Sequence, residues 1–300
     1  MPEPIVECVP NFSEGRDART VEAIAAAAAS VGSITILDLS LDEDHNRSVI
    51  TFAGPAAAVG EAALRAVAQA AAAIDLRRQM GAHPRIGAAD VVPFVPVRDI
   101  TIEQCAQLAA ATGERIWRTL RVPVYLYGAA ARHPDRVNLE NIRRGGFEGL
   151  RDSIRTDPQR RPDFGEAELH PSAGATAVGA RTFLIAFNIN LNTGDISIAR
   201  QIARSIRTSS GGLPCVKALG LRLESRNLAQ VSMNLTDFER TPVSAVFREV
   251  RRQAAELGVT IAESELIGMI PRAALDDSEA WLPTVRGFHP GLILENRLGI

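Results

Sequence analysis

The sequence has 300 residues, of which 46% are hydrophobic and 23% are charged, a composition typical of globular proteins that bury a sizeable core. Its formal net charge of −2 at pH 7 argues against non-specific nucleic-acid binding, because such binding requires a strongly basic face. All 33 basic residues except Lys217 are arginines, whose forked guanidinium groups suit carboxylate ligands.

The cysteines and the apolar segments narrow the class of protein further. Three cysteines without CxxC spacing indicate neither a disulfide framework nor a zinc site. No apolar run is long enough to cross a bilayer, and a strand-like segment begins almost at Met1. We therefore expect a cytoplasmic protein without a membrane segment.

The first part of the chain alternates strand-like and helical patterns. A short strand at 5–9 leads into the polar loop NFSEG, and the following segments read as a helix over 17–31, strands over 33–39 and 47–53, and an alanine-rich helix from Pro55 to about Ile74. Segment 90–97 is strand-like, but Pro93 and Pro96 confine it to a sheet edge or a bulge. Thr101 and Gln104 predict a capping box for the next helix, and 122–128 reads as another strand.

Residues 132–179 differ in character. They are rich in Arg, Pro, Gly and Asp and weakly periodic, apart from a short helix near 138–154. Long irregular stretches in compact chains tend to carry function, so we predict a functional connector here.

Regular patterns return at Arg181 and repeat the order of the first part. The segments read as a strand at 182–191, a helix at 195–206, strands at 216–223 and 228–238, a helix capped by Thr241 and opened by Pro242, and a strand from 259. Both halves therefore run strand, helix, strand, strand, helix, strand, the pattern of ferredoxin-like folds. We predict an α/β (α+β) protein with two ferredoxin-like βαββαβ subdomains, residues 1–179 and 180–300. Helices should cover one face of each mixed sheet, with a ligand groove between the subdomains.

Few residues stand out as catalytic candidates. His83 lies in the stretch GAHPRIG, where glycines permit close backbone approach, Pro84 restricts it, and Arg85 can hold an anion. The alternative interpretation is a Gly/Pro turn that merely contains a histidine. The loop DEDHNRS gathers polar side chains without any metal-binding motif, so we predict no metal site. The stripe Gln230, Ser232 and Asn234 fits either the solvated face of a sheet or a hydrogen-bonding wall of the groove.

The same segments carry a family resemblance. The stretches VECVPNFSEG, NRSVITF, GAHPRIGAADVVPFVPV, VPVYLYG, PDFG, GARTFLIAFNINL, NLAQVSMNLTDF and NRLGI resemble glutamate formimidoyltransferase in order and spacing, through essentially the whole chain. The resemblance implies transfer of the formimino group from N-formimino-L-glutamate to tetrahydrofolate, a co-substrate, during histidine degradation. It implies two α/β subdomains with folate between them, a homodimer and no metal. Animal members are fused to a cyclodeaminase. This chain stops where the transferase part ends, which leaves a separate cyclodeaminase open as a partner.

The resemblance also assigns site residues. The general acid/base falls on His83, whose imidazole pKa lies near the working pH and suits a proton shuttle. The folate-binding segment falls on Gly165, Glu166, Ala167, Glu168, Leu169, His170, Pro171, Ser172, Ala173 and Gly174. For the carboxylates of the substrates we select Arg47, Arg85 and Arg181.

The sequence departs from animal members at two of these places. Ser40 stands where they have an acid, and we expect Asp44 to substitute for it. Ala173 stands where they have an aromatic residue, so stacking of the pterin on that loop is not expected. Two other functions remain open from the sequence. One is an enzyme acting on 5-formyltetrahydrofolate, by formyl transfer to glutamate or by cyclisation. The other is a folate-binding module without catalysis.

Overall fold

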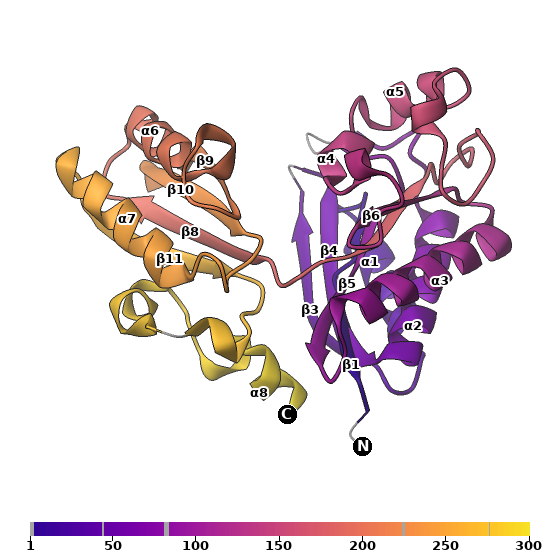
Figure 1. Cartoon of the computed structure of the whole chain (residues 1–300), viewed down its shortest axis with the longest axis horizontal. Helices are drawn as coiled ribbons and strands as arrows, with labels where there is room; N and C mark the ends of the chain where they lie inside the picture. The colour runs from indigo at the N-terminus through magenta and orange to yellow at the C-terminus, as the bar shows by residue number, and fades with distance from the viewer. Residues whose placement is uncertain (1–2, 44, 81–83, 224–225, 276) are drawn as a thin grey trace. The chain divides into compact units, whose positions relative to one another are not determined.

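The computed structural model describes residues 3–43, 45–80, 84–223, 226–275 and 277–300. The chain divides into two compact units, Met1–Arg181 and Thr182–Ile300, each with its own sheet and its own apolar core (Figure 1). The predicted fold class, two subdomains that mix helices and sheets, is confirmed.

The first unit begins with the predicted ferredoxin-like order. Its elements are β1 (Ile5–Cys8), β2 (Asn11–Phe12), α1 (Ala18–Ala29), β3 (Thr35–Asp42), β4 (Arg47–Pro55), α2 (Ala56–Ala73) and β5 (Ala89–Arg98). The strands β1 and β2 occupy one line between β4 and β5 and are antiparallel to both, while β3 pairs with the outer side of β4. Three loops of this unit matter for the site: the loop between β2 and α1, the loop that joins β3 to β4, and the loop that joins α2 to β5.

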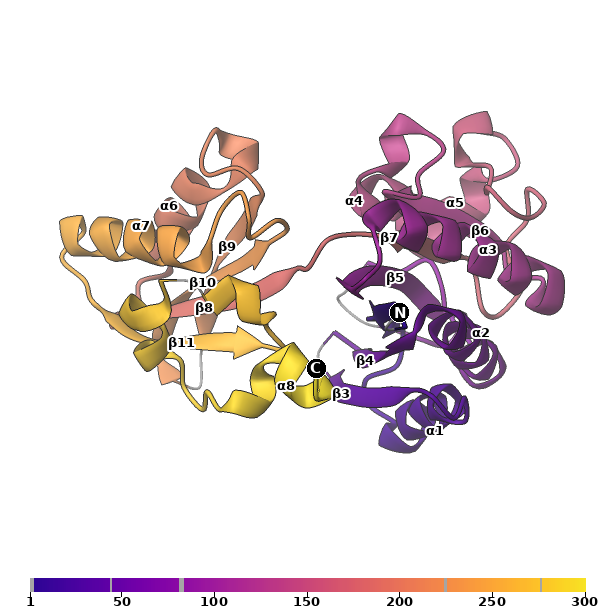
Figure 2. The ribbon, with the colours of Figure 1, turned by 60° about the horizontal axis from the view of Figure 1, so that its bottom comes forward.

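A helix and two strands extend this core. The capping box of Thr101 and Gln104 opens α3 (Ile102–Leu120) as predicted, and β6 (Val124–Gly128) follows. The strand β7 (Thr176–Ala180) runs parallel to both β5 and β6, which completes a seven-stranded sheet. Figure 2 shows α1, α2 and α3 along one face of this sheet, where Val6, Cys8 and Phe52 belong to the buried apolar core.

The strand β5 departs from one sequence prediction. It lies inside the sheet, between β1 and β7, and not at an edge. The bulge alternative holds, since Ile5 pairs with Arg98 and Val6 with Pro96, which leaves Val97 as the extra residue of β5. A bulge interrupts the ladder locally, so a residue without an N–H is accommodated there.

The segment 132–179 packs within the first unit. It contains η1 (Pro134–Arg136), α4 (Leu139–Ile142), α5 (Gly146–Ser153), η2 (Pro158–Arg160) and then β7. Phe147, Leu150 and Ile154 are buried in the core of this unit. These apolar side chains hold the irregular segment against the sheet, so it can present polar groups at fixed positions.

The second unit is a ferredoxin-like domain by its strand order. Its elements are β8 (Ile185–Leu191), α6 (Ile196–Ile206), η3 (Thr208–Ser210), β9 (Val216–Leu223), β10 (Leu228–Leu235), α7 (Val243–Glu256) and β11 (Ile261–Ile267). The sheet is antiparallel in the order β11-β8-β10-β9. Helices α6 and α7 lie side by side over one face of it (Figure 2). Thr241 does not cap α7 as predicted, because its hydroxyl donates to the Pro214 carbonyl at 2.6 Å and Pro242 takes the N-cap position.

The other face of this sheet carries the polar stripe of β10. Gln230 is buried there and donates from Nε2 to Asn190 Oδ1 at 2.9 Å, and Asn190 Nδ2 donates to Glu263 at 3.0 Å. Asn234, further along the strand, is exposed. The stripe is therefore part buried network and part solvated surface.

The last part of the chain folds back on this unit. It comprises η5 (Arg272–Leu275), η6 (Ser278–Ala280), η7 (Leu282–Thr284), η8 (Pro290–Leu292) and α8 (Leu294–Leu298). Trp281 is fully buried and meets Phe187 edge to face, with ring centroids 5.5 Å apart. In the described parts of both units, no helix combines the length and the apolar character needed to cross a membrane.

Candidate functional site

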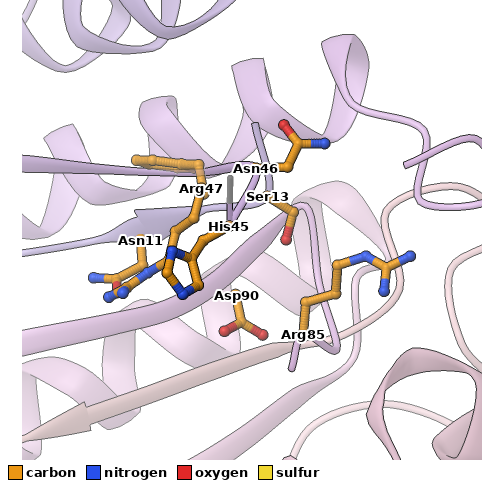
Figure 3. Close-up of a pocket in the computed structure, with 8 residues that line it drawn as sticks. Asn11, Ser13, His45, Asn46, Arg47, Arg85 and Asp90 are labelled. Atoms are coloured by element: carbon orange, nitrogen blue, oxygen red, sulfur yellow. The ribbon is translucent and has the colours of Figure 1, made fainter. Parts of the chain in front are cut away.

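A small polar pocket lies where β2 ends and β4 and β5 begin. Its lining comes from the loops at this end of the first unit's sheet: Asn11, Phe12, Ser13, His45, Asn46, Arg47, Arg85 and Asp90 (Figure 3). Two of the arginines selected from the sequence, Arg47 and Arg85, are brought together here. His83 and Asp44, the two other residues expected at this place, lie outside the described residues.

Side chains of the pocket bind Gln79 and Met80, which directly precede residues 81–83. The side-chain amide of Asn46 donates to Gln79 Oε1 and, at 3.2 Å, to the Met80 carbonyl. Gln79 in turn donates from Nε2 to Glu14 Oε2 at 2.6 Å. These bonds connect the loops that carry NFSEG, HNRS and QMGAH.

Glu14 anchors this chain of hydrogen bonds. Its other oxygen, Oε1, accepts from the backbone amides of Arg16 at 2.8 Å and Asp17 at 2.9 Å, and only 8% of the residue is exposed. Asn46 completes the connection by accepting from the Gly15 amide at 3.0 Å. A buried carboxylate that is fully bonded in this way makes the three loops rigid relative to one another.

Asp90 holds the flank that follows residues 81–83. It is 3% exposed, and its Oδ1 accepts from the Ile86 amide at 2.8 Å. Its Oδ2 accepts from Nη2 of Arg143, which follows α4, and only 14% of the Arg143 side chain is exposed. Sequence reasoning missed this pair. Asp90, an acid directly before an apolar strand, was a detectable signal, whereas nothing near Arg143 in the sequence links it to β5.

Arg85 binds the backbone more than it faces the pocket. Its Nη2 donates to the Gln79 carbonyl at 2.5 Å and to the Leu76 carbonyl at 3.4 Å, and it reaches Glu148 at 3.4 Å. Figure 3 shows its guanidinium directed away from Asp90 and Arg47. It also lines a neighbouring cleft of about 460 Å³, together with Leu76, Arg77, Gln79, Met80, Phe147, Glu148 and Arg151. Arg85 therefore stabilises the loop that follows α2, and it lines both the pocket and the neighbouring cleft.

Arg47 carries the charge of the pocket. Its Nη2 donates to Asn11 Oδ1. Burial and the neighbouring positive charge of Arg143 lower the pKa of Arg47, and Asp90 and Asp42 act in the opposite direction. An arginine keeps its proton in such surroundings, so a partly buried positive charge stands at this end of the sheet.

The third selected arginine, Arg181, does not line this pocket. It follows β7, and its backbone amide donates to the Phe94 carbonyl at 3.1 Å. Its positive charge partly offsets the effect of burial on Glu7 of β1, where burial raises the pKa from 4.5 to about 7. The structure thus gives Arg181 an acidic neighbour.

Sequence reasoning also missed Asp42, an acid that pairs with His45 of the pocket. Asp42 Oδ2 lies 2.7 Å from Nδ1 of His45, and Asp42 Oδ1 accepts from the His45 amide at 2.9 Å. Ser40 lies two residues earlier on β3 and is exposed. The role expected of Asp44 stays a prediction, and Asp42 is a described acid two residues before it.

The segment Gly165–Gly174, assigned to folate by the resemblance, lies directly against residues 86–88. The Ala175 amide donates to the Ile86 carbonyl and the Ala88 amide to the Ala173 carbonyl, each at 2.9 Å. The two backbones approach so closely that a Cβ on Gly87 would lie 1.9 Å from the Ala175 carbonyl oxygen. Glycine is required at both ends of this contact, since Gly174 also has a φ of +69°.

Individual residues of this segment play different parts. Leu169 and Ala173 are buried in the apolar core, and Nδ1 of His170 accepts from the Ala173 amide at 3.0 Å. Burial lowers the pKa of His170, which agrees with a neutral imidazole acting as an acceptor. The Leu76 amide donates to the Ser172 carbonyl at 2.9 Å. The members left exposed are Gly165, Glu166, Glu168 and Pro171, with Ala167 partly exposed.

The motif PDFG fixes the start of this segment. Asp163 is almost fully buried and accepts from the Leu126 amide at 2.8 Å and from Nη1 of Arg136 at 2.6 Å. Arg136 also donates to the carbonyls of Gln159 and Arg161. This buried ion pair joins the start of the segment to η1, and we therefore assign it a structural role.

Across the described ranges, no group of three or more His, Cys, Asp or Glu side chains is arranged to hold a metal ion. The residues that line the pocket supply side-chain amides, a carboxylate, an imidazole and guanidinium groups. The pocket can hold an anion on arginine and move protons through a histidine.

Comparisons with known proteins agree over both units. The family model "Formiminotransferase domain, N-terminal subdomain" matches residues 5–181, and "Formiminotransferase domain" matches residues 186–285. The chain is 44% identical over 295 residues to the glutamate formimidoyltransferase of Streptococcus pyogenes serotype M1, with 98% of each chain covered. It is 45% identical over 296 residues to the protein of that name from Thermoplasma acidophilum, with 98% and 97% covered. Identity to the formimidoyltransferase-cyclodeaminase of Mus musculus is 42%, over 99% of this chain and 57% of that one.

Proposed function

Because the chain belongs to the formiminotransferase family, we propose that it transfers the formimino group of N-formimino-L-glutamate to tetrahydrofolate, giving 5-formiminotetrahydrofolate and L-glutamate. It is then a one-carbon transferase of histidine degradation with tetrahydrofolate as co-substrate.

One structural observation supports this proposal above the others. The segment assigned to folate and the segment that carries His83 are joined by backbone hydrogen bonds at Ile86 and Ala88. The polar pocket with Arg47 and Asp90 stands at the same place. A folate held at 165–174 would therefore lie next to a pocket suited to an anionic donor.

The chemistry requires two proton transfers. N5 of tetrahydrofolate attacks the amidine carbon and forms a C–N bond, giving a tetrahedral intermediate. Its collapse breaks the bond between that carbon and the nitrogen of glutamate. We assign both proton transfers to His83, which takes the proton from N5 and gives it to the leaving nitrogen. Its described flanks support this role, since Met80 and Ile86 are bonded to Asn46 and Asp90 of the pocket.

The remaining parts of the proposal follow the family. Tetrahydrofolate contacts the exposed members of Gly165–Gly174, and Arg181 contributes a further positive charge for a carboxylate. The protein acts in the cytoplasm as a homodimer. We further propose that a separate cyclodeaminase, the second activity named for the mouse relative, consumes the product.

The first experiment measures glutamate release from N-formimino-L-glutamate and tetrahydrofolate by the wild type and by His83→Ala. We expect turnover by the wild type and a fall in kcat of about 10²-fold or more in the variant, with folate binding kept. His133→Ala is the matched control, because His133 is exposed and makes no side-chain capping bond.

Each outcome is informative. Turnover of 5-formyltetrahydrofolate without turnover of N-formimino-L-glutamate would support the folate site but refute N-formimino-L-glutamate as the donor. Equal turnover by the wild type and His83→Ala would refute the proton-transfer role. Folate binding without any turnover would support the alternative that the protein is a folate-binding module without catalysis.

A further inference from the structure

We infer that Arg47 and Arg143 together form the subsite for the α-carboxylate of the amino-acid donor, and that this pair selects a donor with a carboxylate next to its reacting nitrogen. The inference rests on the proposed function, which supplies the donor. It adds Arg143, a residue of the irregular segment 132–179, to the functional residues.

The charges at the pocket favour an anion: Arg47 and Asp90 line it, and Arg143 is bonded to Asp90. Arg47 and Arg143 are close enough for the charge of Arg143 to lower the pKa of Arg47. Asp90 is the buried acid beside them, and its Oδ2 is bonded to Arg143. A second described acid that acts on Arg47 is Asp42, which is half exposed and lies against His45. Among the described residues, two guanidinium groups thus stand near one buried carboxylate, which is bonded to Arg143. A carboxylate from the ligand would balance the second charge.

Unused donors point the same way. The Nε atoms of Arg47 and Arg143 are buried and have no hydrogen-bond partner among the described residues. A buried N–H without a partner is unfavourable, and two such groups from neighbouring arginines are the donors that a carboxylate accepts from. Arg85 also has an unpaired Nε, but its terminal nitrogens are bound to backbone carbonyls, which leaves it a structural role.

The position of the pair identifies which carboxylate it binds. In N-formimino-L-glutamate the α-carboxylate is attached to the carbon that bears the reacting nitrogen, so it must lie close to the group that moves protons. The carboxylates of the folate tail lie at the far end of the aminobenzoyl group. The arginine pair adjoins Asp90 and Asn46, which hold both described flanks of the segment with His83. The donor carboxylate therefore fits this place, and the folate tail does not.

The test compares Arg47→Gln and Arg143→Gln with the wild type, using Arg144→Gln as the matched control. Arg144 is the next residue along the chain, is exposed, and donates to Asn141 Oδ1 at 2.9 Å. We expect KM for N-formimino-L-glutamate to rise by about 10- to 100-fold in each of the two variants, the range of a charge-assisted hydrogen bond. KM for tetrahydrofolate should stay within about twofold, and the control should match the wild type.

A second donor separates binding from general damage. Formamidine carries the same reacting group without a carboxylate, so its use by the wild type should be poor and unaffected by either substitution. The preference for N-formimino-L-glutamate over formamidine should therefore fall by the same factor. Loss of activity toward both donors in equal proportion would refute the subsite and show a structural role. A rise in KM for tetrahydrofolate alone would assign the pair to the folate tail and also refute it.

Binding of L-glutamate by calorimetry tests the subsite without turnover. If the wild type does not use N-formimino-L-glutamate, the proposed function fails, but weaker L-glutamate binding in Arg47→Gln and Arg143→Gln would still support the subsite. Unchanged L-glutamate binding would refute it. Should Arg143→Gln fail to fold because Asp90 is left unpaired, the double variant Asp90→Asn, Arg143→Gln removes that charge and keeps an oxygen for the Ile86 amide.

Discussion

The buried acid Glu7 gives the most quantitative prediction. On β1 its neighbours Val6 and Cys8 belong to the apolar core, and Glu7 lies between Ala53 of β4 and Val95 of β5. It is 4% exposed, and burial raises its pKa from 4.5 to about 7, with Arg181 as a partial offset. Replacing it by glutamine keeps the shape and removes the titration.

The direction in which the free energy of unfolding changes with pH follows from the number of protons bound by the folded and unfolded chains. Between about pH 4.5 and about pH 7 the unfolded chain has lost the proton of Glu7 while the folded protein still holds it. The free energy of unfolding therefore falls as pH rises through this window, and the loss is complete above it. A shift from 4.5 to about 7 corresponds to a loss of about 3 kcal/mol.

The assay is urea unfolding of the wild type and Glu7→Gln at several pH values from about 5 to about 8.5, followed by circular dichroism. Taking the difference between the two proteins cancels every other titrating group. We expect the variant to gain about 2–3 kcal/mol over the wild type across this range. In Glu22→Gln, a change at an exposed position of α1, the corresponding difference should stay within about 0.5 kcal/mol.

A flat difference between the wild type and Glu7→Gln would refute the reasoning. It would mean that Glu7 is ionised in the folded protein near neutral pH and that the charge of Arg181 fully compensates its burial. A difference that grows toward low pH would have the wrong sign and would refute it as well.

Two further predictions concern backbone contacts and ion pairs of the first unit. Gly174→Ala should lower kcat and destabilise this unit by about 1–3 kcal/mol, because φ is +69° and the added Cβ would lie 2.2 Å from the Ile86 carbonyl oxygen. Thermal unfolding and turnover measure these effects, and an unchanged variant would show that the contact with Ile86 is loose. Asp163→Ala should cost about 3–5 kcal/mol in urea unfolding, since Arg136 loses its buried partner. Asp152→Ala, an exposed acid on α5, is its control, and equal stability of the two would show that the PDFG ion pair is not structural.

Local sequence signals determined the elements and their order. The capping box at Thr101, the apolar period of α7 and the alternation along β10 each depend on neighbouring residues, and each led to the observed element. The repeat of strand, helix, strand, strand, helix, strand gave the fold class, because antiparallel neighbours joined by short connections leave few alternative topologies. The motifs also carried the family, which the comparisons confirmed.

The pocket depended on contacts between residues far apart in the chain. Arg143 meets Asp90 across 53 positions and Gln79 meets Glu14 across 65, and no local pattern encodes either pair. The same holds for Arg85 and Arg181, which looked like Arg47 in the sequence but differ from it in their partners. The sequence by itself determined which residues form helices and strands and what family chemistry to expect. Only the tertiary structure decided which charged side chains are buried together, because the burial of a charge and its partner depend on the packing of distant segments.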